Sequence, residues 1–319
     1  MFAVVILIPG INMSSNVPRV AVVIATYNRW PLVTRAVDSV LSQSHAGTRC
    51  VVVDDASSDG TPANLLEKYG DRITLIQQPV NREKSAARNL GVQSADADYV
   101  CFLDSDDELT RDSVSSRLEV FLRDPRFDGV AYGFCTNAGR LPENLKDLPA
   151  APPEGNVVAE YLRTYFVHNN GFLIKRTTML QLGMYQESLT HREDREILIR
   201  LAAQLEFRCS RSNVADIHLT RGSARFEYEK ASQQGMRMVQ LLRANPGIAR
   251  QLGTHLRAAE QKECWEWLRG LYKSGDYRTF RKMTAANLGL FDVFRDRASL
   301  CRRYLASFVR EWFWSRPKV

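Results

Sequence analysis

The N-terminal two thirds of the chain alternates short apolar runs with stretches of helical spacing. The apolar runs are typical of buried strands, and they cover Val20–Ala25, Cys50–Val53, Ile73–Ile76 and Tyr99–Leu103. Apolar positions three and four residues apart predict helices between them, at Pro31–Leu41, Thr61–Tyr69 and from Ser85–Gly91 onward. Strands and helices in this rhythm form a parallel sheet covered on both faces. The pattern therefore predicts an α/β domain.

Beyond residue 228 the pattern changes, because apolar residues recur at helical spacing with almost no strand signal. The predicted helices are Tyr228–Leu242, Ile248–Tyr272, Tyr277–Leu288 and Ala298–Trp314. Turns rich in Pro, Gly and Asn separate them. We therefore predict an α/β domain over residues 17–228 and an all-helical appendage over residues 229–319.

Residues 1–16 stand apart from both domains. Met1–Ile11 is apolar, but it is far shorter than the roughly 20 residues that span a bilayer. It also lacks the positive start and small-residue cleavage site of a signal peptide. Met13, followed by three polar residues, is an alternative start. We predict that residues 1–16 are a leader, either disordered or upstream of the true start.

Composition and charge narrow the class of protein. The 45% hydrophobic and 25% charged content is that of an ordinary soluble globular protein. The six cysteines are scattered, which argues against a zinc site or a disulfide framework and suits a reducing cytoplasm. Residues 231–319 hold 17 Lys or Arg against 7 Asp or Glu. This excess indicates an acidic partner, such as anionic lipid or a polyanionic glycan.

Polar clusters directly follow three of the predicted strands. They are Thr26-Tyr27-Asn28, Asp54-Asp55 and Asp104-Ser105-Asp106-Asp107. In such sheets ligands bind beyond the carboxyl ends of the strands. No Walker A loop or G-x-G-x-x-G segment follows a strand, so a glycine-rich phosphate cradle is excluded. The alternative way to hold a diphosphate is a divalent cation, and Asp104 and Asp106 offer the oxygen ligands that a hard cation prefers. A solvated acidic turn or a helix N-cap is the other interpretation of these aspartates.

The chain resembles glycosyltransferase family 2, with the GT-A fold, from residue 19 to about residue 225. The resemblance rests on segments in family-like order: Val22–Arg29, Val53–Thr61, Asn81–Gly91, Phe102–Asp107, Leu182–Leu189, Glu193-Asp194 and Leu198–Leu201. It implies an inverting hexosyl or hexosaminyl transferase that uses a nucleotide-sugar donor and Mn²⁺ or Mg²⁺. UDP is the expected nucleotide, with dTDP and GDP as alternatives.

The resemblance also implies roles for individual residues. Those expected to bind the nucleotide are Thr26, Tyr27, Asn28, Asp55, Arg88 and Asp104. Among them, Tyr27 is expected to pack against the base and Asp55 to read it. Asp106 is expected to ligate the metal, and Asp104 to reach the metal or the ribose. His218 is a further candidate ligand, although a lone histidine in an alternating strand is more often structural.

Glu193 and Asp194 begin a predicted helix, where a carboxylate is often only a cap. In this family the aspartate of the pair resembles the general base that accepts the proton of the acceptor hydroxyl. We therefore expect Asp194 to be the base, supported by Glu193. One base without a nearby nucleophile predicts a single displacement with inversion at the anomeric carbon.

The chain departs from the family pattern at two places. Glu83 stands where the family has glycine, which removes easy access to positive φ and predicts a reshaped loop. It also adds a negative charge, which Lys84 offsets. Tyr185-Gln186 replaces the commoner Phe-Asp. Neither change touches the metal pair or the base, so activity is still expected.

The basic C-terminal segment suggests where the protein works. Arg302, Arg303 and Arg310 alternate with aromatic residues up to Trp314, a pattern that predicts peripheral contact with an anionic membrane. Packing of the aromatic rings onto the preceding helices is the alternative. The resemblance implies a glycan or lipid-linked acceptor in cell-envelope polysaccharide synthesis, at the cytoplasmic face of the membrane. No nucleic-acid-binding module is present.

Two other functions remain open from the sequence. A non-catalytic nucleotide-sugar-binding or scaffold protein of a glycan assembly complex is favoured by Glu83 and disfavoured by intact Asp106 and Asp194. A nucleotidyltransferase would need a glycine-rich basic loop after the first strand, where this chain has Thr26–Arg29.

Overall fold

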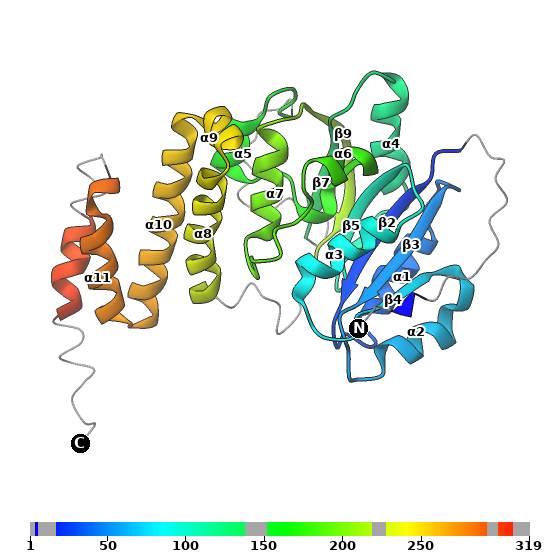
Figure 1. Cartoon of the computed structure of the whole chain (residues 1–319), viewed down its shortest axis with the longest axis horizontal. Helices are drawn as coiled ribbons and strands as arrows, with labels where there is room; N and C mark the ends of the chain where they lie inside the picture. Colours follow the sequence, from blue (N-terminus) through cyan, green and yellow to red (C-terminus); the bar gives the residue numbers. More distant parts are fainter. Residues whose placement is uncertain (1–3, 6–16, 138–151, 219–227, 292–298, 309–319) are drawn as a thin grey trace. The chain divides into compact units, whose positions relative to one another are not determined.

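The computed structural model describes residues 4–5, 17–137, 152–218, 228–291 and 299–308 (Figure 1). The chain divides into two compact units, Met1–Arg221 and Gly222–Val319. The sequence pattern places this boundary between residues 228 and 229.

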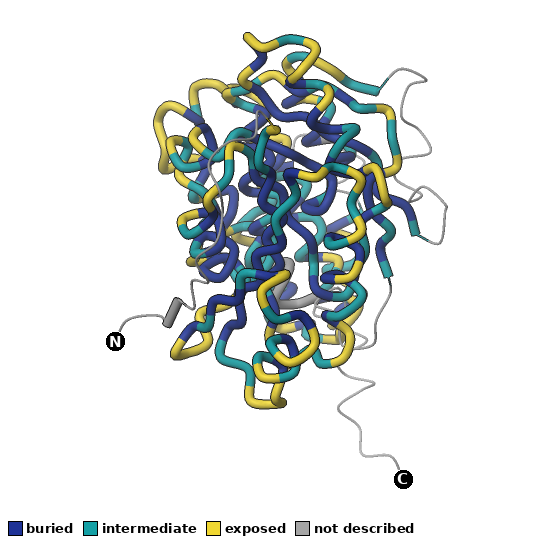
Figure 2. Tube along the Cα trace, turned by 90° about the vertical axis from the view of Figure 1, so that its right-hand side faces the viewer, coloured by how far each residue is buried: buried dark blue, intermediate teal, exposed yellow. Residues whose placement is uncertain are grey.

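The parallel part of the first unit's sheet has β2 (Val20–Thr26) at its centre. It pairs in parallel with β3 (Thr48–Asp54) on one side and β5 (Tyr99–Asp104) on the other. β4 (Thr74–Gln77) continues the parallel ladder beyond β3. These are the four strands predicted from the apolar runs, and each is confirmed with small shifts at its ends. They are largely buried; Figure 2 draws the buried parts of the trace in dark blue.

The remaining strands make the sheet mixed. β8 (Phe172–Lys175) is antiparallel to both β5 and β7 (Val130–Thr136). β9 (Phe207–Asp216) runs parallel to β7 and antiparallel to the short β6 (Glu108–Leu109). At the other edge β1 (Val4–Val5) pairs with β4, so two residues assigned to the leader join the sheet. Within the described residues the strand order is β1-β4-β3-β2-β5-β8-β7-β9-β6.

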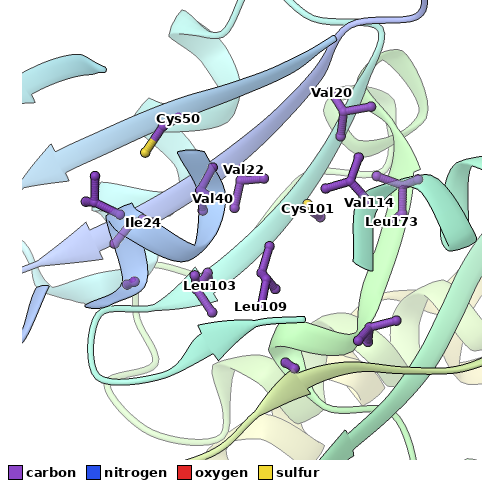
Figure 3. Close-up of a cluster of buried hydrophobic side chains, with 14 of the residues drawn as sticks. Val20, Val22, Ile24, Val40, Cys50, Cys101, Leu103, Leu109, Val114 and Leu173 are labelled. Carbon is purple, nitrogen blue, oxygen red and sulfur yellow. The ribbon is translucent and has the colours of Figure 1, made fainter. Parts of the chain in front are cut away.

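One face of this sheet is covered by α1 (Val33–Leu41), α2 (Thr61–Tyr69) and α4 (Ser113–Arg123). Alternate side chains of β2 point to this face because successive strand residues face opposite sides. Figure 3 shows Val20, Val22 and Ile24 of β2 in one cluster with Val40 of α1. Burial of each such side chain contributes roughly 1.5–3 kcal/mol.

The opposite face carries α3 (Glu83–Ser94), which lies close to the strands. Gly91 makes this approach possible, because a Cβ at this position would lie 2.4 Å from Cγ1 of Val23. The glycine of the Ala-Arg-Asn-Leu-Gly segment is therefore needed for the close packing of α3 against β2. The other helices of this unit are η1 (Gly70–Arg72), α5 (Val158–Thr164), η3 (Asn169–Gly171), α6 (Arg176–Gln181) and α7 (Glu193–Ala202).

The second unit is helical throughout its described residues. Its elements are α8 (Tyr228–Ala244), α9 (Pro246–Leu252), α10 (Thr254–Ser274), α11 (Tyr277–Asn287), η5 (Leu288–Leu290) and a helix over residues 299–308. The single helix predicted over Ile248–Tyr272 is wrong. Gly253 adopts a φ of 50° and its N–H donates to the Ala249 carbonyl, which ends α9 before α10 begins.

The core of the second unit forms between α10, α11 and the last described helix. Its fully or nearly buried members are Cys264, Leu268, Leu271, Phe280, Phe291 and Leu300. Of the predicted helix Ala298–Trp314, residues 299–308 are helical, and Trp312–Trp314 lie outside the described residues. Among the helices that the structure describes, none has the length and apolar character needed to cross a membrane.

Candidate active site

The carboxyl ends of three parallel strands meet at one edge of the sheet. The ladders of β2 pair Thr26 with Asp54 and Ala25 with Asp104. The Asp55 N–H also donates to the Thr26 carbonyl at 2.8 Å. The structure thus brings together the polar clusters that follow these strands in the sequence.

The loop after β2 is joined to the loop after β3 through Asn28. This residue has a φ of 49°. Its N–H donates to Ser57 Oγ and its Oδ1 accepts from the Ser58 N–H, both at 2.8 Å. Thr26 is buried, whereas Tyr27 is 47% exposed. The tyrosine ring is therefore open to a planar ligand.

Asp55 lies buried between the ends of β3 and β4. Its Oδ1 accepts from Gln78 Nε2 and from the Arg82 N–H, both at 2.8 Å. Burial raises the pKa of this carboxyl, although hydrogen bonds from the Arg82 and Glu83 backbone oppose the shift. Asp54 instead accepts from the Ser57 N–H at 3.0 Å, and so caps the turn.

The three carboxylates of the acidic loop after β5 differ in their exposure to solvent. The side chains of Asp104 and Asp106 are 31% and 16% exposed, whereas Asp107 is 3% exposed. Both Asp107 oxygens are engaged, since Oδ2 accepts from Asn170 Nδ2 and Oδ1 from the His218 N–H, each at 2.7 Å. Burial, with the charge of Asp104, raises the pKa of Asp107 to about 7.

Arg88 connects this loop to the start of α7. Its Nη2 lies 2.6 Å from Asp104 Oδ1, and its Nη1 lies 2.9 Å from Glu193 Oε1. Lys84 Nζ lies 2.8 Å from the same Glu193 oxygen. The Glu193 side chain is 1% exposed, so one buried carboxylate holds two cations. Such charge-assisted contacts fix geometry more strongly than neutral ones.

Asp194 follows Glu193 in the first turn of α7. Burial would raise the pKa of its carboxyl, but the charges of Lys84, Arg195 and His168 outweigh burial and hold the pKa below its ordinary value. The same helix terminus favours a negative charge. Asp194 is therefore ionised at neutral pH, as an acceptor of protons must be.

The residues around Asp104 and Asp106 suit a divalent ion that arrives with a diphosphate. Among the described residues no three His, Cys, Asp or Glu side chains gather as a metal site. His218 Nε2 instead lies 2.9 Å from Glu108 Oε1. Mg²⁺ needs only one or two protein carboxylates when phosphates and water complete its shell. Asp104 and Asp106 could provide such hard oxygen ligands.

Glu83 takes the backbone conformation that glycine adopts readily. Its φ is 68°, in the left-handed region that costs other residues on the order of 1–3 kcal/mol. Its N–H lies 3.2 Å from Asn81 Oδ1. The positive φ is thus kept without the glycine.

Several residues of the site have no strong sequence signal. Asn169 Nδ2 donates to Asp104 Oδ1 at 3.3 Å, and Asn170 Oδ1 accepts from the Asp104 N–H at 3.1 Å. The carbonyl of Asn170 in turn accepts from the buried Arg117 at 3.2 Å. The sequence signal that could have identified them is the pair of adjacent asparagines just before the apolar run Phe172–Ile174.

Residues 21–180 match the family model described as Glycosyl transferase family 2. This match covers half of the chain and includes the strand ends, Arg88 and the acidic loop. The chain belongs to glycosyl transferase family 2. The resemblance seen in the sequence is thereby confirmed.

Relatives within family 2 include proteins named for polysaccharide synthesis. The amylovoran biosynthesis glycosyltransferase AmsB of Erwinia amylovora is 31% identical over 192 residues, covering 56% of this chain and 62% of AmsB. The succinoglycan biosynthesis protein ExoO of Rhizobium meliloti is 38% identical over 104 residues, covering 33% and 30%. The chain spans about half the length of the curated relatives it matches.

Solved structures share the GT-A fold of this family 2 protein. The mannosyltransferase PcManGT of Pyrobaculum calidifontis, in complex with GDP-Man and Mn²⁺, has a TM-score of 0.60 and 20% identity, covering 95% of this chain and 89% of that one. TarS of S. aureus in complex with UDP-GlcNAc has a TM-score of 0.58 and 16% identity, covering 92% and 89%. At these identities the likeness establishes the fold alone.

Proposed function

We propose that the protein is an inverting glycosyltransferase that transfers a sugar from a nucleotide diphosphate to a glycan or lipid-linked hydroxyl. The observation that carries the proposal is the Arg88 guanidinium, which contacts Asp104 at the strand ends and Glu193 beside Asp194. It ties an acidic donor site to an ionised candidate base. The names of AmsB and ExoO support a polysaccharide acceptor.

In this proposal the nucleotide lies across the ends of β2 and β3. The exposed Tyr27 ring packs against the base, and the buried Asp55 carboxylate accepts a base N–H, with Thr26 and Asn28 shaping the pocket. A UDP sugar is the first candidate, in line with the TarS complex, and GDP remains an alternative through PcManGT. dTDP is the third candidate.

Asp104 and Asp106 would hold Mn²⁺ or Mg²⁺, whose chemistry is to neutralise charge on the leaving diphosphate. His218, paired with Glu108, would have to leave that contact to become a further ligand. Arg88 keeps Asp104 in place, and its own charge stays close to the phosphates. These residues orient the donor for attack from the opposite side.

Asp194 acts as the general base. Its carboxylate accepts the proton of the acceptor hydroxyl while that oxygen forms a bond to the anomeric carbon and the bond to the nucleotide diphosphate breaks. One displacement inverts the configuration at that carbon. Glu193 supports the base by holding Lys84 and Arg88, and it takes no proton itself.

The helix over residues 299–308 supports peripheral contact with an anionic membrane. Arg302, Leu305 and Phe308 are exposed on one side of it, with Leu305 at 68% and Phe308 at 50% exposure. Arg281 lies over the Phe308 ring at 4.3 Å. Apolar anchors beside cations suit a lipid interface, whereas an exposed leucine offers little to a polar glycan. We therefore propose that the enzyme works at the cytoplasmic face of the membrane.

Cosedimentation with vesicles tests the membrane contact. The full chain should bind phosphatidylcholine vesicles containing phosphatidylglycerol better than phosphatidylcholine alone, and L305S/F308S should bind less. Equal binding of the wild-type protein to both vesicle types would contradict the proposed contact with an anionic membrane.

Calorimetric titration of UDP, GDP and dTDP, with and without Mn²⁺, tests the donor site. We expect one nucleotide to bind in a metal-dependent way. Binding without turnover of any sugar donor would favour the scaffold alternative. Absence of binding in both metal states would overturn the enzyme proposal.

A further inference from the structure

Tyr185 is a buried residue whose hydroxyl belongs to the candidate site. It is 2% exposed, and its ring packs edge-on against Phe102, with centroids 5.0 Å apart. The Arg88 guanidinium lies over the same ring at 5.2 Å. Its hydroxyl donates to Asn169 Oδ1 at 2.6 Å. A phenylalanine would keep the ring contacts and lose only this hydrogen bond.

The hydroxyl determines which way the Asn169 amide faces. An amide presents an acceptor on one side and two donors on the other. Because Tyr185 occupies the acceptor, the donor side faces Asp104 Oδ1 at 3.3 Å. Asn169 is 2% exposed, so bulk water cannot replace the hydroxyl without a rearrangement. A buried acceptor left without a donor is unfavourable.

The orientation of the Asn169 amide in turn affects the orientation of the Asp104 carboxylate. Among the described residues, Arg88 Nη2 donates to this carboxylate at 2.6 Å and Asn169 Nδ2 donates to it at 3.3 Å, and both bonds fall on Oδ1. The Asp104 side chain is 31% exposed, and Oδ2 is the oxygen that accepts neither of these two bonds. Two donors on one oxygen fix the plane of the carboxylate.

We propose that Tyr185 is a positioning residue of the donor site, acting through Asn169 to present Asp104 Oδ2 to the metal–nucleotide complex. This inference rests on the proposed function, because it requires Asp104 to contact the donor. It assigns a task to the hydroxyl that distinguishes Tyr185 from the phenylalanine commoner at this place. Tyr185 itself touches neither donor nor metal.

The direct test compares Y185F with Y132F by calorimetry. Tyr132 is also buried, and its hydroxyl donates to the Pro153 carbonyl at 2.7 Å, outside the site. We expect Y185F to weaken Mn²⁺-dependent nucleotide binding by roughly three- to tenfold, as loss of one hydrogen bond does. The loss should be smaller without Mn²⁺. Y132F should bind as the wild type does.

A double-mutant cycle shows whether Asn169 carries the effect. If it does, Y185F should weaken binding in the wild type but add nothing in an N169A background. N169S serves the same purpose should N169A fail to fold by circular dichroism. Additive effects of the two substitutions, or unchanged binding by Y185F, would overturn the inference. The proposed function would still stand in that case, provided that the wild-type protein binds the nucleotide. A wild type that binds no nucleotide would overturn both.

Discussion

The site contains two pairs of neighbouring carboxylates that differ in the same way. In the first pair Asp107 is buried and accepts two hydrogen bonds, whereas Asp106 is part-exposed. In the second pair Glu193 is buried against Arg88 and Lys84, whereas Asp194 is more accessible. In each pair one carboxylate is buried with protein partners and its neighbour is more exposed.

This comparison shows why sequence adjacency does not imply equal function. Adjacent side chains at a strand end or a helix start point in different directions, so one can face the core while the next faces the ligand. Buried carboxylates are retained only with partners, because an unpaired buried charge is costly. Asp107 and Glu193 have such partners, and in the proposed function they hold the framework on which Asp106 and Asp194 act.

The largest effect is expected for D194N. The amide cannot accept the hydroxyl proton, so the transfer rate should fall by about 10²–10⁴-fold. Nucleotide affinity should stay unchanged, because Asp194 acts on the acceptor side. Release of nucleotide from a sugar donor measures transfer, and calorimetry measures affinity. Transfer at the wild-type rate would rule out Asp194 as the base.

E193Q should mainly lower stability. It removes the charge shared by Arg88 and Lys84, and breaking a buried pair costs on the order of 3 kcal/mol. The free energy of unfolding in urea measures this loss. Donor affinity should also fall, since Arg88 then keeps only Asp104.

E196Q is the matched control on the same helix. Glu196 is 2% exposed and accepts from Arg200 Nε and Nη2 at 2.9 and 3.0 Å. It should lose a similar stability but keep its donor affinity. Equal loss of donor affinity in both variants would contradict the link between Glu193 and the donor site.

The smallest effect is expected for K84M, as a shift of the pH profile. Lys84 is the first among the charges that lower the pKa of Asp194. Transfer needs the ionised base, so it is lost as the pH falls through this pKa. Removing Lys84 raises the pKa and should move the acid limb of kcat/KM to higher pH.

K175M is the control for that profile. Lys175 is 30% exposed, close to the 35% of Lys84, and pairs with Asp128 at 3.3 Å. Its profile should match the wild type. A K84M profile that also superimposes on the wild type would show that Lys84 does not tune the base.

The parallel half of the sheet could be predicted because its signals are local. Apolar runs, followed by polar residues, mark β2, β3 and β5 and also place Asp55 and Asp104. β8 is as short as β4, but it pairs antiparallel with β5 and β7, and the strand–helix rhythm that predicts the parallel strands does not extend to it. The helix break at Gly253 was missed because the flanking spacing continues across it.

The supporting part of the site could not be predicted because its contacts join distant segments. Arg117 looks like a solvent-facing residue of α4, yet it is fully buried. Its Nη1 donates to the carbonyls of Asn170 and Phe172 at 3.2 and 2.9 Å. The hydrogen bond from Tyr185 to Asn169 likewise depends on the folded chain. The local sequence pattern identifies the charged side chains, whereas only the folded structure shows which of them support other residues of the site.

The most direct test is nucleotide titration with Mn²⁺ into D106N and D107N side by side. Each variant replaces one carboxylate oxygen with an amide NH2 group. The two positions are adjacent, but Asp107 is buried and Asp106 is partly exposed. We predict that D106N loses the metal-dependent part of the nucleotide affinity. D107N should lose about 1–3 kcal/mol of stability, because its amide faces a donor, and should keep that affinity. Loss of metal-dependent binding in D107N alone, or wild-type binding by D106N, would contradict the account.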